Sequence, residues 1–187
     1  KNLGAADWTL GAEVPQPPNL PATAEFGEAL AAPYHLRATA GPQHPQWIAV
    51  GAPGAGRAYI YCVNPTSAQP LTFAQVVDPN AGGRFGGALA IADFDGDGDQ
   101  DLAVGSPTEN GLAGRVRVYP GTGVNCGAGA QVVNVAQVVV VTPTQIQSGR
   151  FGAALTAGMV DPDHPTRPQL VIGAPEAYPS GVSKSVL

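Results

Sequence analysis

Residues 93–101 read Asp93-Phe94-Asp95-Gly96-Asp97-Gly98-Asp99-Gln100-Asp101, so five of the fourteen acidic residues in this 187-residue chain fall within nine positions. Carboxylates this close repel one another unless a cation binds between them. Gly96 and Gly98 can adopt the positive φ angles of a tight loop that turns its carboxylates inward. Hard oxygen ligands without a neighbouring His or Cys favour Ca²⁺ over Zn²⁺ or copper.

The pattern predicts one Ca²⁺ held by the side chains of Asp93, Asp95, Asp97 and Asp101. The alternative is a solvated acidic turn, because Asp-Gly pairs are also common in β-hairpins. An EF-hand loop would match at its first, third and fifth positions, but its twelfth position should be Glu and is Val104. Short apolar runs of strand length flank the loop at 88–92 and 102–104. We therefore expect the loop to join two strands.

The residues around the loop carry a resemblance to a known family. Phe85-Gly86, the Asp-rich loop and Gly105-Ser106-Pro107 together resemble an FG-GAP repeat, the unit of the β-propeller in integrin α-subunits and many bacterial extracellular proteins. The resemblance implies that the side chains of Asp93, Asp95, Asp97 and Asp101 bind Ca²⁺ together with the backbone carbonyl of Asp99.

The same signature occurs three times. Its first half stands at Phe26-Gly27, Phe85-Gly86 and Phe151-Gly152, and its second half at Gly51-Ala52-Pro53, Gly105-Ser106-Pro107 and Gly173-Ala174-Pro175. The second halves are 54 and 68 residues apart, a period typical of propeller blades with several short strands. We expect third strands at 57–61 and 115–119 and fourth strands at 71–77 and 131–141. Phe26, Phe85 and Phe151 should be buried between blades.

The predicted fold is therefore all-β, with blades of about four antiparallel strands. Residues 1–25 form an N-terminal arm with one strand at 7–10 and a Pro-rich connector, and residues 26–187 form three FG-GAP repeats, at about 26–84, 85–150 and 151–187. Propellers typically have four to eight blades. Three repeats are thus either part of a longer propeller or blades completed by another chain through strand exchange at a vacant sheet edge, in a ring or a filament.

Calcium is expected in the second repeat alone. The positions equivalent to Asp93, Asp95, Asp97 and Asp101 are Thr39, Gly41, Gln43 and Trp47 in the first repeat, and Asp161, Asp163, Pro165 and Gln169 in the third. Two carboxylates with Arg167 nearby form a weak cation site at best.

The charge and composition of the chain limit the classes of partner that it is expected to bind. A net charge of −5 with nine Lys and Arg argues against binding to nucleic acid or to an anionic membrane surface. Apolar runs such as 138–141 are far shorter than the roughly 20 residues that span a bilayer, so no membrane insertion is expected. The chain begins at Lys1 without a signal-like segment, as expected of a processed chain or of a piece of a longer one.

Cys62 and Cys126 could be buried thiols, a pair of metal ligands or a disulfide. Two ligands are too few for zinc, and a calcium loop suits the extracellular Ca²⁺ concentration. We favour a disulfide and an oxidising location, extracellular or at the cell surface, with the periplasm as a further option.

The sequence shows no catalytic signature. Its three His residues are isolated, and it has no H-E-x-x-H, no G-x-S-x-G and no phosphate-binding glycine loop. We therefore expect no enzyme but a calcium-stabilised extracellular module for protein-protein interaction, adhesion or surface assembly. Its partner would be another protein, further copies of itself or a glycan. The alternative is the propeller portion of a secreted hydrolase or a glycan-binding lectin.

Overall fold

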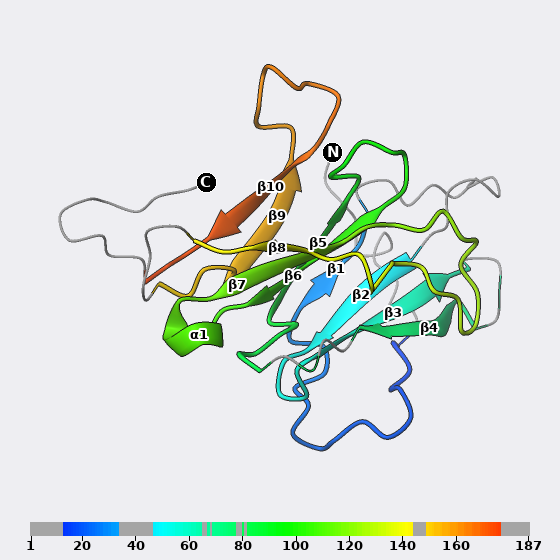
Figure 1. Ribbon diagram of the computed structural model, residues 1–187. Helices are drawn as coiled ribbons and strands as arrows, with labels where there is room; N and C mark the ends of the chain where they lie inside the picture. The colour runs from blue at the N-terminus through cyan, green and yellow to red at the C-terminus, as the bar shows by residue number, and fades with distance from the viewer. Residues whose placement is uncertain are drawn as a thin grey trace, which may run out of the picture.

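The computed structural model describes residues 13–33, 47–64, 67, 69–77, 80, 82–143 and 149–176, and their regular secondary structure is almost entirely β-strand (Figure 1). The strands are β1 (Leu30–Ala31), β2 (Trp47–Ala52), β3 (Arg57–Val63), β4 (Leu71–Val77), β5 (Ala88–Ala92), β6 (Asp101–Ser106), β7 (Arg115–Tyr119), β8 (Val139–Val141), β9 (Ala154–Gly158) and β10 (Gln169–Gly173). One short helix, α1 (Glu109–Leu112), lies between β6 and β7.

The strands form three antiparallel sheets, which we call blades one, two and three. Blade one has the order β1-β2-β3-β4, blade two has the order β5-β6-β7-β8, and blade three has β9 beside β10. The first strand of blade two lies against the first strands of both other blades, so small residues meet where the blades are closest. The all-β prediction with four-stranded antiparallel blades is confirmed. The strand expected at 7–10 and the chain beyond residue 176 lie outside the described residues.

The expected third and fourth strands of blade one appear as β3 and β4, and β7 also appears as predicted. The fourth strand of blade two is wrong in extent, because β8 covers Val139–Val141 rather than 131–141. Val133 is not part of this strand, because its backbone binds blade one instead. Its N–H and C=O both bind the buried side-chain amide of Gln75 in β4, at 3.0 Å each.

Residues 13–25 have no regular secondary structure and pack on the outer side of blade one. The Tyr61 hydroxyl of β3 donates a hydrogen bond of 2.7 Å to the carbonyl oxygen of Pro15. Val14 and Leu20 pack against the same apolar cluster as Tyr61. The Pro-rich segment therefore lies on blade one rather than apart from it.

The repeated glycines allow neighbouring blades to approach closely. Gly86 has φ +94°, and its N–H donates to the Gly105 carbonyl of its own repeat at 3.1 Å. Its own carbonyl oxygen faces Gly51 of the preceding repeat so closely that a Cβ there would overlap it. Gly152 and Gly105 repeat this arrangement between blades two and three. Both halves of the signature therefore belong to one contact between blades.

The three phenylalanines do not share one environment. Phe85 and Phe151 are fully buried, as predicted, and Phe85 packs edge-to-face on Tyr119. The prediction was wrong for Phe26, which is partly exposed and packs on Tyr59 and Tyr61 of its own repeat. Phe85 and Phe151 are each covered by the preceding blade, whereas no blade among the described residues covers Phe26.

A disulfide joins Cys62 of β3 to Cys126 in the segment between β7 and β8, with a Cα–Cα distance of 5.4 Å. The predicted pairing is confirmed. Together with the bonds between Gln75 and Val133, this crosslink holds the segment after β7 against blade one.

Substituting Gly105→Ala should destabilise the fold by about 1–3 kcal/mol, because the new Cβ would overlap the Gly152 carbonyl oxygen. Thermal unfolding measures the effect. Gly82→Ala is the control, since no heavy atom lies within 4 Å of its Cβ position. Equal melting temperatures for the two variants would contradict this account of the glycine.

Replacing both cysteines, Cys62→Ser with Cys126→Ser, should lower the free energy of unfolding by about 4 kcal/mol, because the bridge closes a span of 64 residues. Urea unfolding with and without a reducing agent measures this loss. The reductant should lower the stability of the parent and leave that of the double variant unchanged. Two alkylatable thiols in the native parent would refute the crosslink.

Candidate metal centre

The acidic loop, residues 93–100, connects the end of β5 to the start of β6. Phe94 anchors it, because its side chain packs on the apolar cluster between blades two and three. From blade three, Arg167 donates a hydrogen bond of 2.6 Å from Nε to the Phe94 carbonyl oxygen. The loop is thus fixed from both sides of a blade interface.

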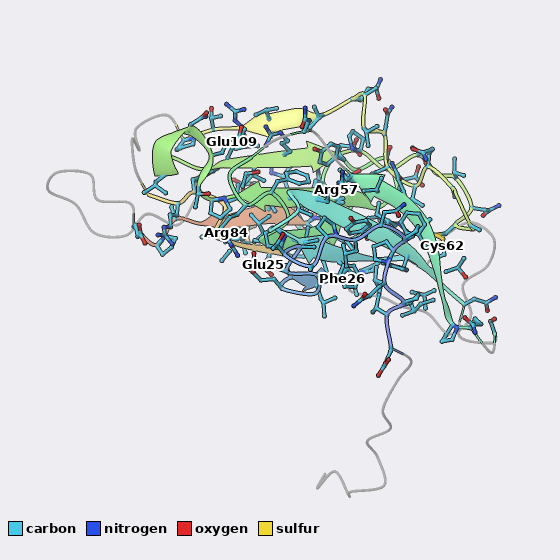
Figure 2. The ribbon with its side chains drawn as sticks, turned by 90° about the horizontal axis from the view of Figure 1, so that it is seen from below. Glu25, Phe26, Arg57, Cys62, Arg84 and Glu109 are labelled. Atoms are coloured by element: carbon cyan, nitrogen blue, oxygen red, sulfur yellow. A yellow bond between two sulfur atoms is a disulfide. The ribbon has the colours of Figure 1, made fainter. Side chains whose placement is uncertain are left out.

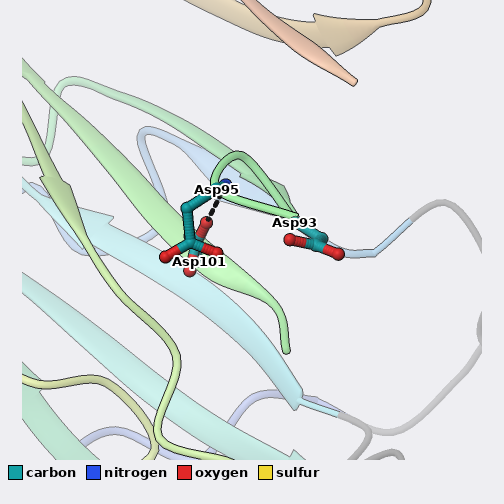
Figure 3. Close-up of side chains that lie close together, drawn as sticks. All are labelled: Asp93, Asp95 and Asp101. Carbon is teal, nitrogen blue, oxygen red and sulfur yellow. Dashed lines mark hydrogen bonds between the residues drawn. The ribbon is translucent and has the colours of Figure 1, made fainter. Parts of the chain in front are cut away.

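Three carboxylates gather at this loop. Asp93, Asp95 and Asp101 each offer an oxygen, and these oxygens lie within 4.8 Å of one another (Figure 3). Within the described ranges this is the sole group of three or more His, Cys, Asp or Glu side chains placed to hold a metal. A set of hard oxygen donors without nitrogen or sulfur suits Ca²⁺ or Mg²⁺.

Backbone donors shape the loop around its carboxylates. The N–H of Gly96 donates to Asp93 Oδ1 at 2.6 Å, and the N–H of Gly98 donates to Asp93 Oδ2 at 3.0 Å. The two glycines have φ values of +84° and +96°, so the expectation of positive φ is confirmed. The loop wraps around Asp93 because glycine tolerates these angles without a Cβ penalty.

Asp101 is the buried member of the group, with an exposed fraction of 1%. Its Oδ2 accepts the N–H of Phe94 at 2.7 Å and its Oδ1 accepts the N–H of Gly121 at 2.8 Å. Burial raises the pKa of the Asp101 carboxyl, while the N–H donors of Gly121 and Phe94 act in the opposite direction.

No Lys, Arg or His of the described segments forms an ion pair with Asp101. A buried carboxylate is costly without a cationic partner. The donor set, the inward-turned loop and a buried carboxylate without an ion-pair partner among the described side chains therefore fit a divalent cation.

Asp97 and Asp99 stand outside the group of three. Oδ1 of the exposed Asp97 accepts the N–H of Asp99 at 2.8 Å. The Asp99 side chain lies beside Gly121 and Gly123, where a Cβ on either glycine would crowd it. The expected roles of the Asp97 side chain and the Asp99 carbonyl stay predictions.

The equivalent loop of blade three is held differently. Oε1 of Gln169 accepts the N–H groups of Val160 and Asp161 at 2.8 and 3.0 Å. His164 Nδ1 lies 2.9 Å from Asp161 Oδ2, and this hydrogen bond lowers the pKa of the Asp161 carboxyl. A side-chain amide and an imidazole thus both bind at the start of this loop, around Asp161.

In the first repeat, Trp47 is buried, and positions 39, 41 and 43 lie outside the described residues. The expectation of no calcium in repeats one and three stays a prediction.

Two contacts of the site could not be found from the loop itself. Gly121 lies 20 residues beyond Asp101, and Arg167 lies 73 residues beyond Phe94. Arg167 carried one sequence signal, its place in the equivalent loop of the third repeat. That place predicts that Arg167 interferes with a cation, not that it bonds to the neighbouring loop.

A cavity of about 350 Å³ opens between the acidic loop and the equivalent loop of blade three. Its lining includes Phe94, Val118, Val141, His164, Arg167 and Leu170.

The comparisons with known proteins agree with this geometry. The FG-GAP repeat family model matches residues 85–119. The chain is 40% identical over 68 residues to human integrin alpha-10, a match covering 36% of this chain and 6% of that protein. It is 31% identical over 159 residues to human phosphatidylinositol-glycan-specific phospholipase D, covering 75% of this chain and 18% of that protein. The matched region is thus a small part of both relatives.

The one helix in the described part of the chain is too short to cross a bilayer. The match at residues 85–119 spans β5, the acidic loop, β6, α1 and β7. Blade two of this chain is therefore built on an FG-GAP repeat.

Proposed function

We propose that the chain is a calcium-stabilised extracellular β-propeller module for protein-protein interaction, in adhesion or surface assembly. The observation that carries the proposal is the group of Asp93, Asp95 and Asp101, whose oxygens converge within 4.8 Å at the junction of β5 and β6. The FG-GAP match over the same strands supports Ca²⁺ as the ion.

The ion would act as a structural staple. Asp101 begins β6 and accepts the N–H of Gly121 just after β7, so its position ties the loop to two strands. Asp93 and Asp95 would complete the charge balance from the loop, together with Asp97 and the Asp99 carbonyl as further ligands. When bound, Ca²⁺ supplies the positive charge that the described side chains do not offer to Asp101.

An extracellular location is supported by the Cys62–Cys126 disulfide, since disulfides persist in oxidising compartments. The similarity to integrin alpha-10 over 68 residues supports an interaction role, because the FG-GAP repeat itself is a non-catalytic unit. Blade edges and connecting loops are the surfaces that such a module offers to a partner.

A second candidate is the propeller portion of a secreted hydrolase or a glycan-binding lectin. It is favoured by the longer match, which relates 75% of the chain to phosphatidylinositol-glycan-specific phospholipase D. In this case the chain would support a catalytic domain elsewhere or bind sugar.

Calcium should raise the melting temperature of the parent chain. At free Ca²⁺ about 100-fold above the dissociation constant, binding adds roughly 2.7 kcal/mol to the free energy of unfolding. Asp95→Asn and Asp101→Asn should each abolish most of this gain, because each removes a charged ligand. Asp163→Asn, the matched change in blade three, should preserve it. A melting temperature that ignores EDTA would refute the calcium staple.

The two function classes differ in a simple assay. We expect the purified chain to leave phosphodiester and ester substrates intact and to show no binding on a glycan array. Turnover of a phosphodiester that is lost on removing calcium, or selective glycan binding, would favour the second candidate instead.

A further inference from the structure

The cavity between blades two and three is separate from the three carboxylates of the metal centre, none of which lines it. Its volume of about 350 Å³ is in the range of sites that bind small ligands and side chains. One wall comes from the acidic loop. The other comes from residues 159–168 between β9 and β10, which we call the blade-three loop. Both loops lie at the upper end of their blades in Figure 1.

The floor of the cavity is apolar. Val118 of β7 and Val141 of β8 contribute to it from blade two, and Leu170 of β10 contributes from blade three. All three side chains pack on the apolar cluster between these blades, yet each is only half-buried. Apolar surface left partly open in a concave site favours an apolar group of a ligand.

Phe94 forms part of the wall and links the cavity to the metal centre. It stands between Asp93 and Asp95 in the sequence, and its side chain packs on the same apolar cluster. Its carbonyl oxygen accepts the hydrogen bond of 2.6 Å from Arg167 Nε. The acidic loop therefore fixes both the aromatic wall and the guanidinium beside it.

Arg167 lines the cavity without a carboxylate partner in the described segments. Its Nε is bonded to Phe94, whereas Nη1 and Nη2 have no bonded acceptor among the described residues. Other arginines each pair with a glutamate: Arg84 with Glu25, which Figure 2 labels near each other, Arg117 with Glu109, and Arg150 with Glu176. The open edge of a guanidinium binds a carboxylate through two parallel hydrogen bonds.

The other polar side chains of the lining are bonded within the blade-three loop. Asp161 Oδ2 lies 2.9 Å from His164 Nδ1, so this carboxylate has its hydrogen-bond partner inside the loop. The side-chain oxygen of Gln169 accepts two backbone N–H groups, and its nitrogen donates to backbone carbonyls. The charged group left to recognise a ligand is therefore Arg167.

We propose that this cavity binds a peptide segment of a partner protein that carries a carboxylate next to an apolar side chain. The carboxylate binds Arg167, and the apolar side chain covers Val118, Val141 and Leu170. The inference rests on the proposed interaction function, for which it gives the chemistry of the partner. A chain terminus and an internal acidic residue share this chemistry.

NMR titration of the 187-residue chain with N-acetyl-leucine at saturating Ca²⁺ tests the site with a minimal probe. The amide signals of Phe94, Arg167 and Leu170 should shift and saturate, with a dissociation constant on the order of 1 mM for so small a ligand. N-acetyl-leucinamide lacks the carboxylate and acetate lacks the apolar group, so each should bind at least about tenfold more weakly. Absence of saturable shifts, or equal binding of N-acetyl-leucine and its amide, would overturn the proposal.

A second probe, acetyl-Leu-Asp-amide, distinguishes the two sources of the carboxylate. It places the charge on a side chain, whereas N-acetyl-leucine places it at a chain terminus. The probe that binds more tightly identifies the kind of segment that the cavity takes.

Arg167→Gln should weaken the binding of N-acetyl-leucine at least about tenfold, because it removes the positive charge and the paired donors. Arg150→Gln is the matched control, since Arg150 precedes β9 at the other end of blade three and pairs with Glu176. Equal binding by the two variants would contradict the role of Arg167.

Arg167 also holds the Phe94 carbonyl, so a further variant leaves the arginine in place. Val141→Phe should fill the cavity and block the probe, whereas Val140→Phe should not, because its side chain lies on the opposite face of β8. Circular dichroism checks that both variants fold. Binding that survives Val141→Phe, as expected of a carboxylate held at the acidic loop instead, would overturn the assignment. The calcium proposal is judged separately, by the response of the melting temperature to EDTA.

Discussion

The close approach of a glycine α-carbon to a carbonyl oxygen of the next repeat is the contact on which the rest of the structure depends. Gly51 meets Gly86 and Gly105 meets Gly152 in this way, and any side chain at Gly51 or Gly105 would separate the blades. Inner strands can then lie side by side, which buries Phe85 and Phe151. The repeat signature thus specifies how two neighbouring blades pack against each other, and not only the conformation of a local turn.

The carboxylates of the acidic loop order the backbone within blade two. They hold backbone N–H groups of the loop and of Gly121, so the same side chains that would bind an ion also order the polypeptide around it. Arg167 then ties this loop to blade three. A change in the conformation of the acidic loop would therefore alter the interface between blades two and three.

Much of this could be predicted from the sequence because repeated signatures encode local strand and turn geometry. β4, β5 and β7 appear at the expected residues, and so do the positive φ values of Gly96 and Gly98. What failed depended on distant partners. The diversion of Val133 requires Gln75, 58 residues earlier, and no strand propensity signals it. The exposure of Phe26 depends on which blade covers it, a property of the assembled fold that its own repeat does not specify.

The crosslink between Cys62 and Cys126 also changes what a cut in the chain can do. It encloses β4, the whole of the acidic loop and β5 to β7 within one covalent ring. A protease that cleaves once anywhere in that ring opens it but releases no fragment, because the two pieces remain joined through sulfur. In a compartment rich in proteases, blade two with its acidic loop would stay attached to blade one after the first cleavage.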